Sequence, residues 1–296
     1  MLHGWIILDK PVGLGSTQAV SAVKRALREA GQPKTKVGHG GTLDPLASGV
    51  LPIALGEATK LAGRMLDATK VYDFTVRFGA QTDTLDTEGK VVATSNVRPT
   101  RGEIEAILPR FTGPIEQVPP AYSALKVDGR RAYDLARAGE EVEMKTRAVT
   151  VHTLDLLDAG AEEATFAATV SKGTYIRSLA RDLALTLNSV GHVTMLRRTR
   201  AGPFGLEQAI SLDFLAELAK ARQLTRTVLP LDAGLDDIPA LPVTPDQARL
   251  LRHGQALFGL PAKPGLSLAK DGDVPVALVE GDGATIKVVR GFNLNE

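Results

Sequence analysis

Three short segments of this chain alternate apolar and polar residues, the first of them strictly, and this pattern constrains the fold more than any other feature. The segments are residues 72–78, 147–154 and 164–170. A period of two places successive side chains on opposite faces of a strand, so each segment predicts a strand with one buried face. Residues 90–94 and 193–200 are two further strand candidates.

Helical patterns separate these strands at irregular intervals. Residues 16–31 repeat apolar side chains at helical spacing, and Ser16 is the expected N-cap. Thr100 and Glu103 form a capping-box pattern ahead of a second amphipathic segment, and residues 174–188 form a third. Some strands follow one another directly, whereas others are separated by helices. We therefore expect an α+β fold, with a mixed, mostly antiparallel sheet and flanking helices.

The length and the distribution of prolines predict two domains. A chain of 296 residues is long for a single hydrophobic core. Residues 230–245 contain four prolines among small and acidic residues, which we interpret as a linker. Short, glycine-rich, strand-like runs follow it. The sequence thus predicts a first domain over residues 1–235 and a small β-rich domain over residues 240–296.

Composition excludes several kinds of chemistry. The chain has no cysteine, so it has no disulfide, no thiol nucleophile and no cysteine-based zinc site. None of its five histidines has H-x-x-x-H spacing, and we expect neither a metal ion nor a cofactor. No apolar run reaches the roughly 18 residues of a membrane span, and the first residues do not resemble a signal peptide. The expected compartment is the cytoplasm.

Residues 38–45, GHGGTLDP, are the most informative segment. Three glycines precede Asp44, and they allow either a close backbone approach or a positive φ angle. A structural turn is the alternative interpretation, because Asp-Pro pairs begin turns and aspartate caps helices. The glycines are followed by neither the Gly-Lys-Ser/Thr of a phosphate loop nor a dinucleotide-binding pattern.

At this segment the sequence closely resembles the TruB family of bacterial tRNA pseudouridine-55 synthases. Six blocks carry the resemblance in the order in which the family has them, and they span most of residues 3–205. One position departs from the pattern: Gly40 stands where the family usually has threonine, and we expect this to loosen the loop that holds His39. The blocks are residues 9–13 (DKPVG), 38–60, 70–72 (KVY), 79–89, 119–126 (PPAYSALK) and 171–177 (SKGTYIR).

The resemblance implies a pseudouridine synthase fold and a role for each motif residue. Asp44 is implied as the catalytic carboxylate, Arg177 as its cationic partner and Tyr72 as a ring against the target base. His39 is implied as a wedge that props the space left by the extruded uridine. Isomerisation of uridine needs no redox change and no group donor. Whether the carboxylate attacks the ribose, adds to the base or opens a glycal route stays open.

The resemblance also implies contacts with the T-arm of tRNA and no obligate protein partner. The nearly neutral net charge of +1 favours a monomer. Residues 117–146 resemble the family's inserted thumb segment, and residues 240–296 resemble a PUA domain, a small RNA-binding module. Clusters of basic residues are candidates for phosphate contacts, although each alone is more often a solvated face. The site candidates for RNA binding are His39, Lys10, Lys126, Arg130, Arg131, Tyr175 and Arg197, and the wider basic clusters add Lys24, Arg25, Arg28, Lys34, Lys36, Arg198 and Arg200.

Three alternative functions remain at this point. The first is the guide-RNA-dependent branch of the same superfamily, which shares the aspartate motif and works inside a multi-protein particle. The second is a non-catalytic RNA-binding protein that assists tRNA folding. The third is a glycosidase with paired carboxylates, for which Glu57 or Asp86 would supply the second acid beside Asp44.

Overall fold

A computed structural model describes residues 1–123, 125–127, 129–140, 142–260 and 263–294. The chain forms two compact units, each assembled from segments that are distant in sequence. Unit 1 comprises Met1–Pro45, Val50–Leu66 and Gly202–Glu296, and unit 2 comprises Leu46–Gly49 and Asp67–Ala201. No helix in the described ranges is both long and apolar enough to cross a membrane.

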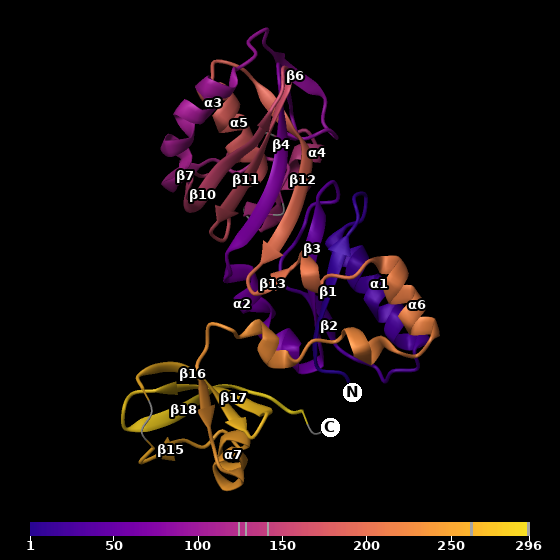
Figure 1. Cartoon of the computed structure of the whole chain (residues 1–296), viewed down its shortest axis with the longest axis vertical. Helices are drawn as coiled ribbons and strands as arrows, with labels where there is room; N and C mark the ends of the chain where they lie inside the picture. The colour runs from indigo at the N-terminus through magenta and orange to yellow at the C-terminus, as the bar shows by residue number, and fades with distance from the viewer. Residues whose placement is uncertain (124, 128, 141, 261–262, 295–296) are drawn as a thin grey trace. The chain divides into compact units, whose positions relative to one another are not determined.

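Unit 2 is built on an antiparallel sheet whose strands lie in the order β12-β4-β11-β10-β7 (Figure 1). The first two residues of β3 extend it, because Ser48 and Gly49 pair in parallel with β12. The predicted mixed, mostly antiparallel sheet is therefore confirmed. The bounds of these strands are β3 (Ser48–Leu55), β4 (Lys70–Phe78), β7 (Gly113–Gln117), β10 (Arg147–Ala159), β11 (Glu163–Val170) and β12 (Gly191–Ala201).

The core of unit 2 lies between this sheet and the helices α3 (Arg101–Ile107) and α5 (Ile176–Thr186). Phe74 and Phe166 stack across neighbouring strands, with ring centroids 5.2 Å apart. The predicted capping box is present, since the Thr100 hydroxyl accepts from the Glu103 N–H and Glu103 accepts from the Thr100 N–H. The 3₁₀ turn η2 (Leu108–Phe111) follows α3.

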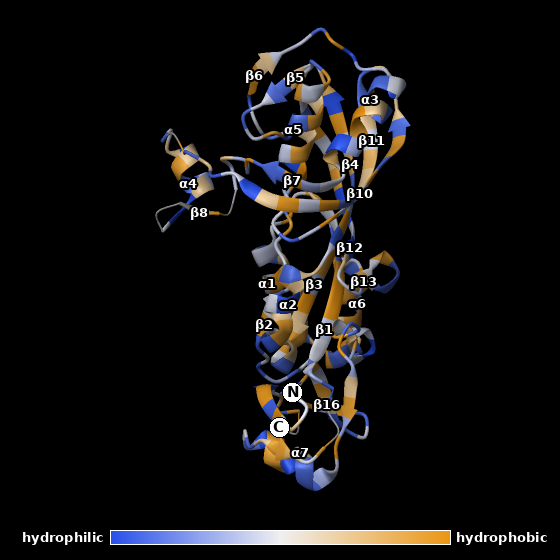
Figure 2. Ribbon diagram, turned by 90° about the vertical axis from the view of Figure 1, so that its left-hand side faces the viewer, coloured by the Kyte–Doolittle hydropathy of each residue, from blue (hydrophilic) through white to orange (hydrophobic). Residues whose placement is uncertain are grey.

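Two smaller elements extend from unit 2. Residues 90–94 form a strand as expected, β6 (Val91–Thr94), and it pairs with β5 (Ala80–Thr82) in a separate ribbon. The segment expected to resemble a thumb carries a short hairpin, β8 (Lys126–Val127) with β9 (Arg130–Arg131), and helix α4 (Ala132–Arg137). This segment projects from the side of the sheet (Figure 2).

Unit 1 contains the N-terminal elements and the helix α6. The predicted first helix is present, but its N-cap is Gly15, whose N–H donates to the Gln18 side chain at 2.8 Å. The prediction of Ser16 as the cap is wrong, because its hydroxyl bonds another loop. The elements are β1 (Gly4–Lys10), α1 (Ser16–Glu29), β2 (Val37–His39), η1 (Gly56–Leu61), α2 (Ala62–Asp67), β13 (Phe204–Gly205), η3 (Leu206–Gln208), α6 (Leu212–Lys220) and η4 (Leu224–Thr227).

The last residues of unit 1 form a β-rich module with its own buried cluster, which includes Leu251, Val276 and Ile286. Its sheet has the order β14-β16-β17-β18-β15. The proline-rich stretch is more ordered than a linker, because it contains η5 and β14. The bounds are η5 (Leu231–Gly234), β14 (Ala240–Pro242), α7 (Pro245–Arg252), β15 (Leu257–Phe258), β16 (Gly265–Asp271), β17 (Val274–Gly281) and β18 (Thr285–Gly291).

Candidate active site

Asp44 lies in the loop between β2 and β3, and hydrogen bonds hold the backbone on both sides of it. The buried Ser16 hydroxyl accepts from the Leu43 N–H at 2.8 Å and donates to the Leu43 C=O at 2.9 Å. The Pro45 C=O accepts from the Gly13 N–H at 2.8 Å. Asp44 itself is half-buried. A braced main chain therefore presents this carboxylate.

Lys10 supports the same loop from the interior of unit 1. Its side chain is 0% exposed. Its Nζ donates to the carbonyl oxygens of Pro11 at 2.9 Å, Leu14 at 2.6 Å and Pro45 at 3.3 Å. A buried ammonium with three carbonyl acceptors is satisfied within the protein. In the free protein Lys10 therefore braces the aspartate loop from inside, and its predicted contact with RNA stays a prediction.

His39 is the last residue of β2 and is half-buried. Its Nδ1 faces the Gly41 N–H at 3.4 Å. The neighbouring Gly40 is buried and its N–H donates to the Pro52 C=O at 2.8 Å. A Cβ added at Gly40 would lie 2.6 Å from the Met65 Cβ. Glycine at this position thus leaves room for Met65 beside the loop that follows His39.

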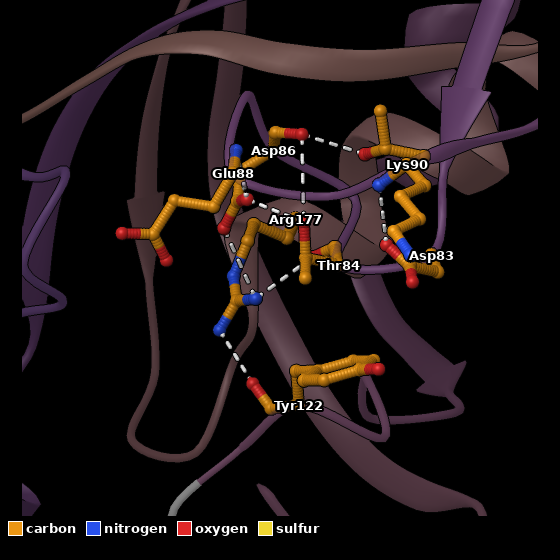
Figure 3. A network of polar contacts seen from close by, with 8 residues as sticks. Asp83, Thr84, Asp86, Glu88, Lys90, Tyr122 and Arg177 are labelled. Carbon is orange, nitrogen blue, oxygen red and sulfur yellow. Dashed lines mark hydrogen bonds and ion pairs between the residues drawn. The ribbon is translucent and has the colours of Figure 1, made fainter. Parts of the chain in front are cut away.

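Arg177 is the second residue of α5 and organises a buried network within unit 2 (Figure 3). Its guanidinium donates to the Thr84 C=O at 2.8 Å and to the Tyr122 C=O at 2.9 Å. It also pairs with Asp86 Oδ2 at 3.3 Å, where the two side chains are only 8% and 12% exposed. One cation therefore joins the loop after β5, the segment after β7 and the start of α5.

The pairing of Asp86 with Arg177 was not predicted from the sequence, although Asp86 lies in the motif of residues 79–89. Its Oδ1 accepts from the Thr84 hydroxyl at 2.5 Å and from the Glu88 N–H at 3.1 Å. The intervening Leu85 has a φ of 63°, a left-handed conformation that costs a non-glycine residue about 1–3 kcal/mol. Arg177 and Asp86 are 91 residues apart in sequence, so spacing alone gave no signal of their pairing.

The segment that ends at Tyr122 is clamped onto the start of α5. The Gln117 side chain donates to the Tyr175 C=O at 3.0 Å and accepts from the Tyr175 N–H at 2.8 Å. The Ser178 hydroxyl donates to the Val118 C=O at 2.8 Å. Tyr175 is thereby fixed by its backbone as the N-cap residue of α5, and its ring is half-buried.

Tyr72 lies on β4 between Ala168 of β11 and Arg198 of β12. Its ring is half-buried and packs against the core cluster of unit 2. On the same sheet Arg197 lies opposite Asp73. Burial raises the pKa of Asp73, and the charge of Arg197 opposes that rise. Arg197 therefore interacts electrostatically with a carboxylate of its own sheet, and its contact with RNA stays a prediction.

Buried cations are a feature that the sequence did not reveal. Arg198 is 1% exposed, so the prediction that it contacts a phosphate is wrong. Lys70 is also buried, at 7%. Burial, together with the nearby charge of Arg198, lowers the pKa of Lys70 to about 8. The Lys70 ammonium donates to the Ala68 C=O at 2.6 Å.

The remaining basic candidates lie on the surface. Arg131 is exposed, and Arg130 is exposed and pairs with Glu140 at 3.1 Å. The side chain of Lys126 lies outside the described part of the structure. Further exposed basic residues lie along or just after α1, namely Lys24, Arg25, Arg28, Lys34 and Lys36.

Neither carboxylate proposed as a second acid has the environment of a proton donor. Burial tends to raise the pKa of Glu57, but hydrogen bonds from Lys60 and the Asn293 N–H hold it below its usual range. The oxygens of Asp86 are occupied by Arg177, Thr84 and the Glu88 N–H. A glycosidase general acid needs a raised pKa, whereas the pKa of Glu57 is lowered, so Glu57 is unsuited to that role.

The mixed sheet with its flanking helices agrees with the fold expected of a pseudouridylate synthase, and the aspartate loop and the arginine-centred network contain the residues that its motifs singled out. The family model of the TruB family pseudouridylate synthase (N-terminal domain) matches residues 24–176. That of the tRNA pseudouridylate synthase B C-terminal domain matches residues 177–236. The chain therefore belongs to the TruB family of pseudouridylate synthases, which are isomerases. The β-rich module lies beyond the matched residues.

Relatives and solved structures support the same assignment. A tRNA pseudouridine synthase B of Zymomonas mobilis is 63% identical over 292 residues, covering 99% of this chain and 96% of the relative. A tRNA pseudouridine synthase B of Novosphingobium aromaticivorans is 63% identical over 301 residues, covering 100% of this chain and 99% of the relative. An H/ACA RNP bound to a substrate RNA containing 2′-deoxyuridine has a similar chain, with a TM-score of 0.74, 25% identity and coverage of 99% and 86%. A chain of a Cbf5-Nop10-Gar1 complex is also similar, with a TM-score of 0.74 and 27% sequence identity. The match covers 98% of this chain and 85% of that one.

Proposed function

We propose that this enzyme converts uridine-55 in the T-loop of tRNA to pseudouridine, with Asp44 as its catalytic carboxylate. The observation that carries the proposal is the bracing of Asp44. Ser16, Gly13 and Lys10 bond the backbone directly before and after it. Fixed placement of a reacting group lowers the barrier, because the geometry is set before the substrate arrives.

The reaction breaks the bond between uracil N1 and ribose C1′, turns the base and forms a bond between C5 and C1′. The final proton moves from C5 to N1, so no atom is gained or lost. A carboxylate can support the electron-poor C1′, as glycosidase carboxylates do. We propose that Tyr72 lies against the base and that Arg177 keeps the site's carboxylate ionised, because a carboxylate shielded from water needs a cation and hydrogen bonds.

Uridine in a folded loop has to leave its stack before a side chain can reach C1′, at a cost of a few kcal/mol. We propose His39 as the planar group that props the vacated space. The exposed basic residues of α1 and of the segment around Arg130 would contact phosphates. The C-terminal module, residues 240–296, would bind tRNA away from the chemistry, as its likeness to a PUA domain suggests.

The relatives favour a stand-alone tRNA enzyme over the guide-dependent branch. Identity is 63% to proteins named tRNA pseudouridine synthase B, and 25–27% to chains of H/ACA particles. We therefore propose an enzyme that acts without an obligate protein partner or cofactor, as a cytoplasmic monomer. A tRNA-folding activity alongside catalysis would persist in an Asp44→Asn protein.

The test is to map pseudouridine in an unmodified tRNA transcript by carbodiimide adducts and primer extension, with EDTA present. A second transcript carries cytidine in place of uridine-55. The proposal predicts one stop, one nucleotide before position 55, in the first transcript and none in the second. Pseudouridine at other positions with none at 55 would overturn the assignment of the position, and tight tRNA binding without pseudouridine would leave a non-catalytic RNA-binding protein.

A further inference from the structure

The Ser123 hydroxyl is a buried polar group for which the described structure offers no partner. Ser123 is 4% exposed. Its Oγ has no hydrogen-bond partner among the described residues, in contrast to other buried serine hydroxyls of unit 2. Folding removes such a hydroxyl from water without a compensating bond, and sites of this kind in native proteins are often functional.

The backbone that carries this hydroxyl is tightly held. The Ser123 N–H donates to the Ala121 C=O at 3.0 Å, and the Ser123 C=O accepts from the Tyr133 N–H of α4 at 3.1 Å. The preceding residue, Tyr122, gives its C=O to the Arg177 guanidinium at 2.9 Å. Ser123 therefore has a fixed backbone and directly follows Tyr122, a member of the arginine-centred network (Figure 3).

A hydroxyl can donate one hydrogen bond and accept others, which matches a ribose hydroxyl or a uracil carbonyl equally well. A uridine that has left its stack exposes both groups and loses its previous partners. A preformed, already desolvated hydroxyl would bond it without breaking an existing hydrogen bond of its own. This explains why a buried serine is kept without a partner in the free protein.

We propose that the Ser123 hydroxyl hydrogen-bonds an oxygen of the reacting uridine, either the ribose 2′-hydroxyl or a uracil carbonyl, and so positions the nucleotide. The proposal rests on the proposed function, since it requires this enzyme to act on uridine. Ser123 is a positioning residue of the substrate, separate from the carboxylate that does the chemistry.

The test compares Ser123→Ala with Ser189→Ala in thermal unfolding and in single-turnover pseudouridine formation. Ser189 is equally buried, at 3%, but its hydroxyl donates to the Val97 C=O at 2.9 Å. Ser123→Ala should keep or raise the unfolding midpoint and lower kcat/KM about 5- to 100-fold, because the substrate oxygen is left unpaired. Ser189→Ala should lower the midpoint and keep the rate of the folded protein.

Substrate analogues then identify the bonded oxygen. Transcripts carry 2′-deoxyuridine, 2-thiouridine or 4-thiouridine at the target, and each weakens one group. The bonded group is the one for which the effects of Ser123→Ala and of the analogue do not add. Additivity with all three analogues, an unchanged rate, or a lowered unfolding midpoint in Ser123→Ala would each overturn the proposal. A wild-type protein that forms no pseudouridine overturns the proposed function as well, whereas an active wild type with an equally active Ser123→Ala overturns only the role of Ser123.

Discussion

Substitution of Ser16 by alanine tests the bracing of the aspartate loop. The Ser16 hydroxyl accepts a hydrogen bond from the Leu43 N–H at 2.8 Å and donates one to the Leu43 C=O at 2.9 Å. Leu43 is 3% exposed, so water cannot replace the lost bonds. At about 1–2 kcal/mol for each buried group left unpaired, Ser16→Ala should lower the free energy of unfolding by about 2–4 kcal/mol.

The same substitution should slow catalysis, because Leu43 directly precedes Asp44. A displacement of about 1 Å in a reacting group can cost about 100-fold in rate, so we expect single-turnover pseudouridine formation to fall about 10- to 100-fold. Ser21→Ala is the matched control in the same helix, since Ser21 is exposed and its hydroxyl bonds only the Thr17 C=O at 3.1 Å. Its stability should change by less than about 0.5 kcal/mol. If the two variants behave alike in urea unfolding and in rate, the bracing argument is refuted.

Three further predictions address other parts of the site. Asp86→Asn removes the charge opposite its buried arginine and should lower the free energy of unfolding by about 3 kcal/mol in urea denaturation; a loss below about 1 kcal/mol would contradict the importance of the pair. Gly40→Ala places a Cβ 2.6 Å from the Met65 Cβ and should cost about 1–3 kcal/mol, whereas Gly38→Ala, whose Cβ would meet nothing within 4 Å, should cost less than Gly40→Ala in the same measurement. Lys70 has a pKa of about 8 in the folded protein, below the value near 10.4 of an unfolded lysine. Between these pH values the unfolded chain binds more protons, so the free energy of unfolding should rise with pH. Lys70→Met should abolish this rise, and an identical pH profile of stability in both proteins would show that the pKa is not lowered.

The alternating strands and the capping box were predictable because they depend on neighbouring residues. The strands over residues 72–78 and 164–170, and the box at Thr100 and Glu103, follow from local periodicity and local hydrogen bonds. Ser16 shows the limit of that reasoning. A serine at the start of a helix is usually a cap, but here its hydroxyl bonds Leu43, 27 residues away.

The contacts within the candidate site could not be predicted from the sequence, because they join residues that are far apart in the chain. The motif that contains Asp44 was found through resemblance, since its glycines and aspartate are equally compatible with a turn. Lys10 and Arg198 were counted among RNA contacts because charged residues are usually exposed, yet both are buried. The orphan hydroxyl of Ser123 is visible only once its surroundings are known.

The most direct test of the account is the single-turnover rate of pseudouridine formation at uridine-55 by Asp44→Asn, with tRNA affinity measured in parallel. Asparagine keeps the size of the side chain and removes its charge. We expect a fall in rate of at least about 1,000-fold with tRNA affinity retained, because the group that supports bond cleavage at C1′ is lost. An Asp44→Asn protein that still forms pseudouridine within about tenfold of the wild-type rate would contradict the central role of this carboxylate.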